Sequence, residues 1–312
     1  MNRQGRWNTI AERGSLAGMR FTLWIYRRFG LGLATALAWP VVAYFVLTDA
    51  GGRRASRRYL ERLAAWAGPR SPVPARPRLS NTFRHYWEFG LSILDRLHLW
   101  AGGADFQVQF PGRHYLQPLL DEKRGAILLG AHLGSFDVLR VLGARHEVPV
   151  NVLMSRGHAS RINSVFRAAF AGVDTHVIEL QPGSPASIFT LRACLERGQF
   201  VAILGDRVSL GPRSRAVHLQ FLGHPAAFPS GPFRLASRLG SPVYFMVAVR
   251  RGRAAYEVFV DQLSEGGEVS PADQDGRARE LMEAYVHRLE SYCLRAPYQW
   301  FNFYDYWLEG HA

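Results

Sequence analysis

The chain has 312 residues and a mass of 35.1 kDa, and 48% of its residues are hydrophobic. This composition excludes an intrinsically disordered chain and predicts one large core or two modest ones. The formal net charge of +13 fits an anionic partner such as phospholipid headgroups, nucleic acid or an acidic carrier protein.

The first predicted element is an uncharged apolar segment at residues 29–48. At about 1.5 Å per residue it is just long enough to cross a hydrocarbon core of about 30 Å. Pro40 predicts a kink inside it, and arginines on both sides give no orientation under the positive-inside rule. We therefore expect residues 1–65 to form a membrane-associating helical region that spans the bilayer or dips into one leaflet. The alternative is a hydrophobic helical hairpin that is buried in a soluble core.

A stretch rich in proline and arginine, residues 66–80, predicts an extended linker. The helix that follows starts after Ser80 or Asn81 and carries apolar side chains on more than one face. The expected organisation is thus an N-terminal region at 1–65, this linker, and an α/β domain at 81–312.

From residue 125 onward, short apolar runs alternate with amphipathic stretches. Strands that alternate with helices are typical of an α/β fold with a mainly parallel central sheet and helices on both faces. The last two strands are expected to form an antiparallel hairpin. The predicted strands are 126–129, 148–154, 175–180, 200–204, 243–249 and 256–260, and the predicted helices are 135–144, 159–171, 185–197, 230–239 and 273–295.

The first of these strands runs into the sequence GAHLGSFD, residues 130–137. Ligands of parallel α/β sheets bind at the carboxyl ends of strands, so His132 lies where chemistry is expected. Asp137 falls in the first turn of the next helix, and its carboxylate can turn back to the imidazole. A carboxylate on one ring nitrogen leaves the other nitrogen to remove a proton, which makes these two residues the predicted catalytic pair. Gly134 and Ser135 are predicted substrate-binding residues, since amides at a helix start can hold a developing oxyanion.

The sequence HLGSFD resembles the H-x4-D motif of lysophospholipid-type acyltransferases, particularly the lipid A biosynthesis (lauroyl/myristoyl) acyltransferase family. Three later segments resemble that family in the same chain order, and the resemblance covers roughly residues 20–307. They are GQFVAILGDR at 198–207, VHLQFLGHP at 217–225 and the aromatic PYQWFNFYDYW at 297–307.

This resemblance implies an enzyme that moves a fatty acyl group to a hydroxyl or amine of a lipid or glycolipid acceptor. The implied donor is acyl-carrier protein or acyl-CoA, and neither a cofactor nor a metal is required. The implied location is the cytoplasmic face of the bacterial inner membrane, peripheral or single-pass, against an anionic membrane surface.

Two departures from the family pattern concern the acceptor more than the reaction. The second motif position, often glutamate in the family, is Asp137 here. The sequence FPSG at 228–231 is similar to the FPEG motif of glycerolipid acyltransferases but lacks its glutamate. We interpret it as a helix entry with Ser230 as the N-cap.

Further polar residues are predicted to bind substrate. Arg156, Arg161 and Asn163 fall in a region where the resembled family carries arginine and asparagine near the acceptor or a phosphate, which guanidinium groups bind well. Asp206 and Arg207 end the fourth predicted strand on the same sheet edge as His132, where they either bind substrate or brace a loop. The aromatic C-terminal segment is expected to pack as a lid, with an acyl groove as the alternative.

Two other functions remain open on the sequence alone. One is a non-catalytic basic protein that binds the membrane surface, and the other is a lipid hydrolase of the same fold. No G-x-S-x-G sequence occurs, which disfavours a serine hydrolase. The arginines are dispersed without a recognisable binding module, which argues against nucleic acid as the partner. The two cysteines exclude a disulfide framework and a four-cysteine zinc site, so both are expected as small buried side chains.

Overall fold

The structure, a computed structural model, describes residues 16–100, 106–139, 150–155, 177–180, 185–208 and 215–307. The helices are α1 (Leu16–Thr48), α2 (Ala50–Ala67), α3 (Leu79–Trp100), α4 (Gln117–Asp121), α7 (Pro185–Glu196), α8 (Gly231–Leu239) and α9 (Gln274–Arg295). The strands are β1 (Gln107–Gln109), β2 (Ile127–Gly130), β3 (Val150–Ser155), β4 (Val177–Leu180), β5 (Phe200–Leu204), β6 (Ala216–Phe221), β7 (His224–Pro229), β8 (Val243–Gly252) and β9 (Ala255–Ser264).

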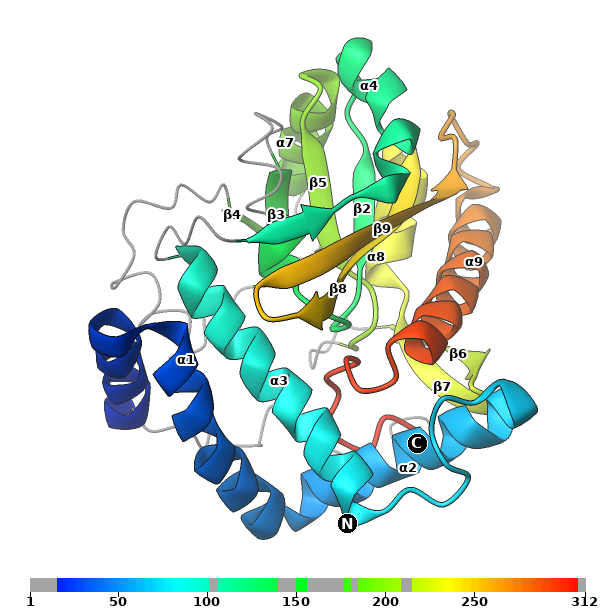
Figure 1. Cartoon of the computed structure of the whole chain (residues 1–312). Helices are drawn as coiled ribbons and strands as arrows, with labels where there is room; N and C mark the ends of the chain where they lie inside the picture. The colour runs from blue at the N-terminus through cyan, green and yellow to red at the C-terminus, as the bar shows by residue number, and fades with distance from the viewer. Residues whose placement is uncertain are drawn as a thin grey trace.

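Seven of the described strands form the central sheet, in the order β1-β9-β8-β2-β5-β3-β4 (Figure 1). β8, β2, β5, β3 and β4 run parallel to one another, whereas β8 and β9 form an antiparallel hairpin. The predicted α/β fold with a mainly parallel sheet and a final hairpin is therefore confirmed. β6 and β7 form a separate antiparallel pair that the sequence analysis did not predict.

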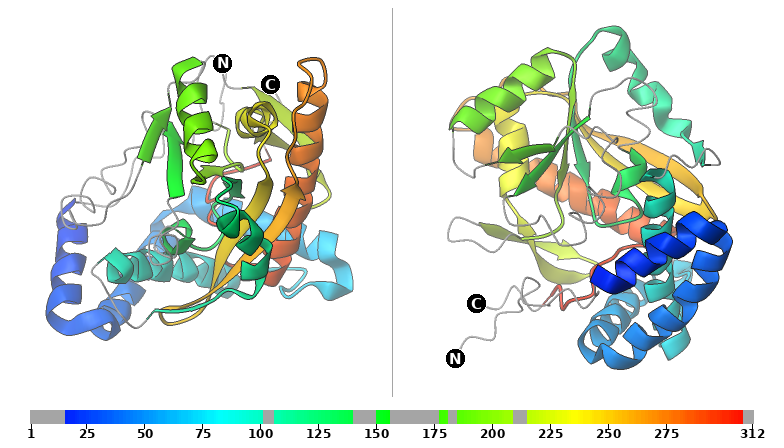
Figure 2. Two further views of the ribbon diagram at one scale, coloured as in Figure 1. Left: turned by 90° about the horizontal axis from the view of Figure 1, so that it is seen from above. Right: turned by 90° about the vertical axis from the view of Figure 1, so that its left-hand side faces the viewer.

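Helices cover both faces of this sheet, as the apolar runs predicted (Figure 2). The alternation of side chains along β2 shows how the two faces are filled. Ile127 and Leu129 pack into a core with α7, α8 and α9, whereas Leu128 packs into a second core with α1, α3 and α4. Each fully buried aliphatic side chain contributes about 1.5–3 kcal/mol to folding, so the strand is held firmly from both sides. The strand end that carries the site is thereby fixed.

Helix α1 is interrupted at Gly30, where the backbone takes φ 75° and ψ −177°. Glycine adopts a positive φ without the steric cost that a Cβ imposes, so the chain bends there. Pro40, at which a kink was predicted, lies inside the helical part that follows. Helix α1 consequently consists of two helical pieces that meet at an angle, and nearly all of the apolar segment lies in the second piece (Figure 1).

The two sides of α1 differ in their surroundings. Leu31 and Ala34 are buried against α3, in the same core as Leu94 and Leu97. The stretch Phe21–Thr48 is long and apolar enough to cross a membrane, with a mean hydropathy of 1.8, yet only 22% of it is buried. The large apolar side chains that remain exposed on it are Phe21, Trp24, Phe29, Leu33, Leu37, Trp39, Val41, Tyr44 and Leu47.

Two local predictions concern segments outside the sheet. α2 ends at Ala67 and α3 begins at Leu79, so the predicted linker does separate two helices. Ser230 does precede α8, but its hydroxyl donates to the carbonyl of Arg215 (3.0 Å) instead of capping the helix. The division of the chain into three regions stays a prediction.

Candidate active site

The site lies where two neighbouring parallel strands end. In the β2–β5 ladder the last residues, Gly130 and Leu204, are partners, and the N–H of Gly205 donates to the carbonyl of Gly130 (3.0 Å). His132 follows the end of β2 and Asp206 follows the end of β5. Because both chains leave the sheet at one edge, the predicted strand-end residues are brought into contact.

His132 and Asp206 form two hydrogen bonds. Nδ1 of the imidazole lies 2.7 Å from Oδ1 of the carboxylate, and the backbone N–H of His132 donates to Oδ2 at 2.9 Å. A carboxylate accepts only, so Nδ1 carries the ring proton and Nε2 is the basic nitrogen. The Asp206 side chain is fully buried, whereas 28% of the His132 side chain is exposed. The arrangement presents an oriented base at the protein surface.

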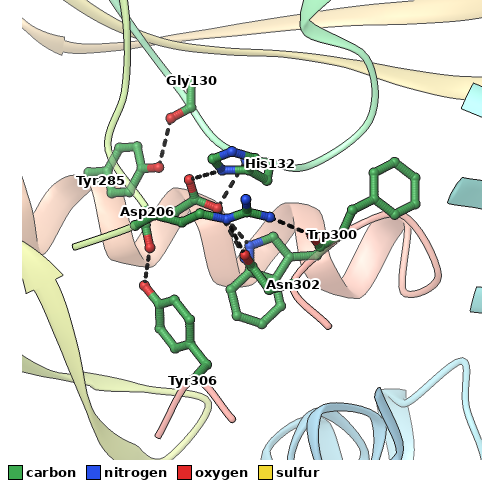
Figure 3. A network of polar contacts seen from close by, with 9 residues as sticks. Gly130, His132, Asp206, Tyr285, Trp300, Asn302 and Tyr306 are labelled. Carbon is green, nitrogen blue, oxygen red and sulfur yellow. Dashed lines mark hydrogen bonds and ion pairs between the residues drawn. The ribbon is translucent and has the colours of Figure 1, made fainter. Parts of the chain in front are cut away.

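Asp206 accepts from further donors on the C-terminal segment (Figure 3). The indole N–H of Trp300 and the side-chain amide of Asn302 donate to Oδ2, at 3.1 and 3.2 Å. Burial by itself raises the pKa of this carboxyl, but His132 and Arg207 outweigh that effect and hold the pKa well below its usual range. The site is thus built around a buried, ionised carboxylate with matched donors.

Two tyrosine hydroxyls donate hydrogen bonds to backbone carbonyls at or just after the ends of β2 and β5. The hydroxyl of Tyr285 on α9 donates to the carbonyl of Gly130 (2.8 Å), and that of Tyr306 donates to the carbonyl of Asp206 (2.6 Å). Trp300 and Tyr306 pack edge to face with ring centroids 4.9 Å apart. The aromatic C-terminal segment therefore packs against the site, and its role as a lid stays a prediction.

The turn after His132 is fixed by backbone contacts. Gly134 has a φ of 69°, and a Cβ there would lie 1.9 Å from the carbonyl oxygen of Ala248, so only glycine fits. Its N–H donates to the carbonyl of Gln299 (2.9 Å), and the N–H of Ser135 donates to that of Ala248 (2.8 Å). These two amides donate to protein acceptors in this structure, and substrate binding by Gly134 stays a prediction. Substrate binding by the Ser135 hydroxyl stays a prediction.

Asp137 lies in the helical turn that includes residues 136–139. Its Oδ2 is 3.0 Å from Nε of Arg96 on α3, and both side chains are mostly buried. The carboxylate found on Nδ1 of His132 is that of Asp206, so the orienting role of Asp137 stays a prediction. Arg96 had no place in the sequence analysis, because nothing along the chain indicates which side chain of α3 faces the motif.

The remaining predicted site residues divide into two groups. Arg207 donates to Oδ1 of Asn302 and to the carbonyl of Phe301, both at 2.7 Å, so it braces the C-terminal segment. Its substrate-binding role stays a prediction. Arg156, Arg161 and Asn163 lie outside the described residues. Within the described ranges, no group of three His, Cys, Asp or Glu side chains is arranged to hold a metal ion.

His85 is a buried residue behind the site that the sequence analysis did not identify. Its Nε2 lies 2.9 Å from the carbonyl oxygen of Trp300, and its Nδ1 lies 2.9 Å from Oγ of Ser56. Nε2–H donates to the carbonyl, and Nδ1 accepts from the serine hydroxyl, so the neutral ring satisfies both partners. Burial lowers the pKa of His85 to about 4. The ring joins α2 and α3 to the segment that holds Asp206.

We expect the stability of the protein to fall between pH 6.5 and pH 4 because of His85. Its pKa is lowered on folding, so the unfolded chain takes up a proton first, and stability present above pH 6.5 is lost as the pH falls. The shift corresponds to about 3 kcal/mol of unfolding free energy. Urea titrations in detergent micelles at several pH values should show this loss in the wild type and a much smaller one in His85→Gln.

The exposed His218 supplies the matched control for that experiment. His218→Gln should retain the full pH dependence of the wild type. If His85→Gln also retains it, the buried ring does not control acid stability.

One family matches the chain over most of its length. A sequence model of a family described as bacterial lipid A biosynthesis acyltransferase matches residues 101–309. The matched range contains every strand of the central sheet, the His132–Asp206 pair and the C-terminal aromatic segment. No curated protein matches the chain.

Proposed function

We infer the function of this site from one premise: the chain belongs to the bacterial lipid A biosynthesis acyltransferase family and is therefore an acyltransferase that acts on lipid. We propose that it moves a fatty acyl group from an acyl thioester to a hydroxyl or amine of a lipid or glycolipid acceptor. His132 is the general base. The non-catalytic and hydrolase alternatives drawn from the sequence have no such family support.

The observation that carries the proposal is the contact between His132 and Asp206. A buried carboxylate 2.7 Å from Nδ1 fixes the ring orientation and stabilises the imidazolium that forms when Nε2 takes a proton. The partly exposed imidazole lies at a strand end, where a substrate can approach it. Thioester acyl transfer needs such a base and no redox group.

The proposed reaction is a direct transfer between two bound substrates. Nε2 of His132 removes the proton of the acceptor hydroxyl as that oxygen forms a bond to the thioester carbonyl carbon. The tetrahedral intermediate then expels the thiolate, which breaks the carbon–sulfur bond. The imidazolium returns the proton to the leaving sulfur, so the enzyme ends in its starting state.

A transfer assay tests this proposal. The full-length protein in phospholipid vesicles is incubated with a radiolabelled acyl-carrier protein thioester or acyl-CoA and with phosphorylated glycolipid or lysophospholipid acceptors. We expect label in the acceptor lipid, resolved by chromatography and mass spectrometry, and none with the His132→Ala protein. Label that appears only as free fatty acid would favour the hydrolase alternative.

We also propose that α1 seats the enzyme in one leaflet of the inner membrane, on its cytoplasmic face. One side of α1 is buried against α3, and the opposite side exposes large aromatic and aliphatic residues. A helix packed along one side against its own protein suits an interfacial position better than a span surrounded by lipid. The net charge of +13 favours an anionic surface.

Polar substitutions on the exposed side of α1 should weaken membrane binding. Leu33, Leu37 and Val41 lie at helical spacing on this side. Replacing all three by glutamine should lower partitioning into phosphatidylethanolamine–phosphatidylglycerol vesicles by at least about tenfold, because the burial of even one such side chain contributes about 1.5–3 kcal/mol. Flotation of the full-length protein with vesicles measures this.

Phe189 on α7 is equally apolar and is 72% exposed, but it lies away from α1. Phe189→Gln should therefore bind vesicles as the wild type does. Equal binding by the triple variant would contradict the seating of α1.

A further inference from the structure

Two consecutive residues of α3, Asp95 and Arg96, contact elements on or next to the central sheet. Asp95 is almost fully buried and accepts from Nε of Arg250 (2.8 Å) and from the hydroxyl of Tyr256 (2.9 Å). Arg250 exchanges two backbone hydrogen bonds of 2.8 Å with the side-chain amide of Gln299. These contacts set the position of α3 against the β8–β9 hairpin and the C-terminal segment.

Arg96, one residue further along, reaches the acid of the H-x4-D motif. Nε of Arg96 is 3.0 Å from Oδ2 of Asp137, and the two side chains are 23% and 15% exposed. An ion pair at this depth is screened less by solvent than a surface pair. The pair therefore constrains the turn that carries the motif.

The turn from His132 to Asp137 is thus held at two places. On one side, the amides of Gly134 and Ser135 donate to the carbonyls of Gln299 and Ala248. On the other side, Arg96 holds the carboxylate of Asp137. A small displacement of a catalytic base lowers the rate steeply, so both attachments bear on how His132 meets its substrate.

We propose that Arg96 is a positioning residue of the acyl-transfer site, which rests on the function proposed above. It fixes the Asp137 carboxylate from α3 through their ion pair. It also compensates a negative charge that would otherwise repel the phosphate groups of an anionic acceptor or donor. Asp137, the acid of the H-x4-D motif, therefore acts together with Arg96, which lies about 40 residues earlier in the chain.

Kinetics of three variants test this proposal in the vesicle transfer assay. We expect Arg96→Gln to lower kcat by about 10- to 100-fold with a smaller change in KM. Arg96→Lys should recover part of that loss, because it retains the charge. Asp137→Asn should lose a similar amount, and the Arg96→Gln/Asp137→Asn double variant should be no slower than the slower single variant, since both changes break one interaction.

Arg84 is the matched control, because it lies on the same helix, is exposed, and its guanidinium lies over the Tyr298 ring. Arg84→Gln makes the same charge change and should keep the wild-type kcat. Thermal melts identify the folded fraction of each protein. If folded Arg96→Gln and Arg96→Lys both keep wild-type kcat, or if the two losses multiply in the double variant, Arg96 has only a structural role. Transfer by the His132→Ala protein would instead overturn the proposed function itself.

Discussion

Replacement of His132 by alanine is expected to abolish acyl transfer almost completely. General base catalysis by a positioned imidazole contributes about 10²- to 10⁴-fold, and we expect kcat to fall by that factor. KM should change little, because the imidazole is proposed to stabilise the transition state and to contribute little to the binding of the ground-state substrates. The vesicle assay with a radiolabelled thioester gives both constants.

Two controls distinguish loss of the base from loss of the fold. His114 is exposed on the surface, and His114→Ala should transfer at the wild-type rate. Since 28% of the His132 side chain is exposed, added imidazole can enter the space left in His132→Ala and should restore part of the activity. A folded, vesicle-bound His132→Ala protein with wild-type kcat would exclude the mechanism.

The strands of the sheet could be predicted because a strand that is buried on both faces consists almost entirely of apolar residues. Four of the six predicted strands lie within two residues of the observed ones, and the predictions for β8 and β9 ended three and four residues early. Parallel strands covered on both faces appear as uninterrupted apolar runs, such as Phe200–Leu204. β7 was missed because it contains two prolines, at 225 and 229, which argue against a strand. β6 alternates polar and apolar residues as a half-buried strand does, and the sequence analysis overlooked that pattern.

The break in α1 at Gly30 was not predicted from the sequence. Proline is the stronger helix breaker in isolated helices, so the kink was predicted at Pro40. The backbone of α1 leaves the helical region at Gly30, where φ is 75°, a value that glycine adopts without the steric cost of a Cβ. The kink at Pro40 stays a prediction.

The position of the site could be predicted from the sequence, but its hydrogen-bond partners could be predicted only in part. His132 and Asp206 each follow a buried strand, and the rule that ligands bind at carboxyl strand ends was enough to place both at one edge. Which carboxylate holds the imidazole depends on the pairing of β2 with β5, which the order of strands along the chain does not reveal. Trp300 and Asn302 reach the carboxylate from a segment far away in sequence. The concentration of aromatic residues there was the one signal available.

Replacement of Asp206 by asparagine is the second large effect that we expect. Within the part of the chain that the structure describes, Oδ2 of Asp206 accepts from His132 N–H, Trp300 and Asn302, whereas Oδ1 accepts from Nδ1 of His132. The single oxygen of asparagine should take the position with three donors, which turns its NH₂ group toward the imidazole. Two donors cannot face one another in a buried site, so the ring must move its proton to Nε2.

The wrong tautomer leaves no base for the acceptor, so kcat should fall by about 10³- to 10⁴-fold with KM nearly unchanged. Nitrogen NMR of the imidazole should find the proton on Nδ1 in the wild type and on Nε2 in Asp206→Asn. Trp300→Phe is the matched control, because it removes one donor and leaves the Nδ1 contact in place, and it should keep the wild-type tautomer.

The pH dependence of stability gives a second readout for Asp206. The folded pKa of this carboxyl is lowered, so its contribution to stability is present above pH 3.8 and is lost as the pH falls below that value. Asp206→Asn should lack this acid-dependent loss, which occurs at lower pH than the one assigned to His85.

If Asp137→Asn shifts the ring proton and Asp206→Asn does not, Asp137 is the orienting carboxylate during catalysis. Retention of both the Nδ1 proton and the wild-type kcat by Asp206→Asn would leave the observed contact with no part in the chemistry.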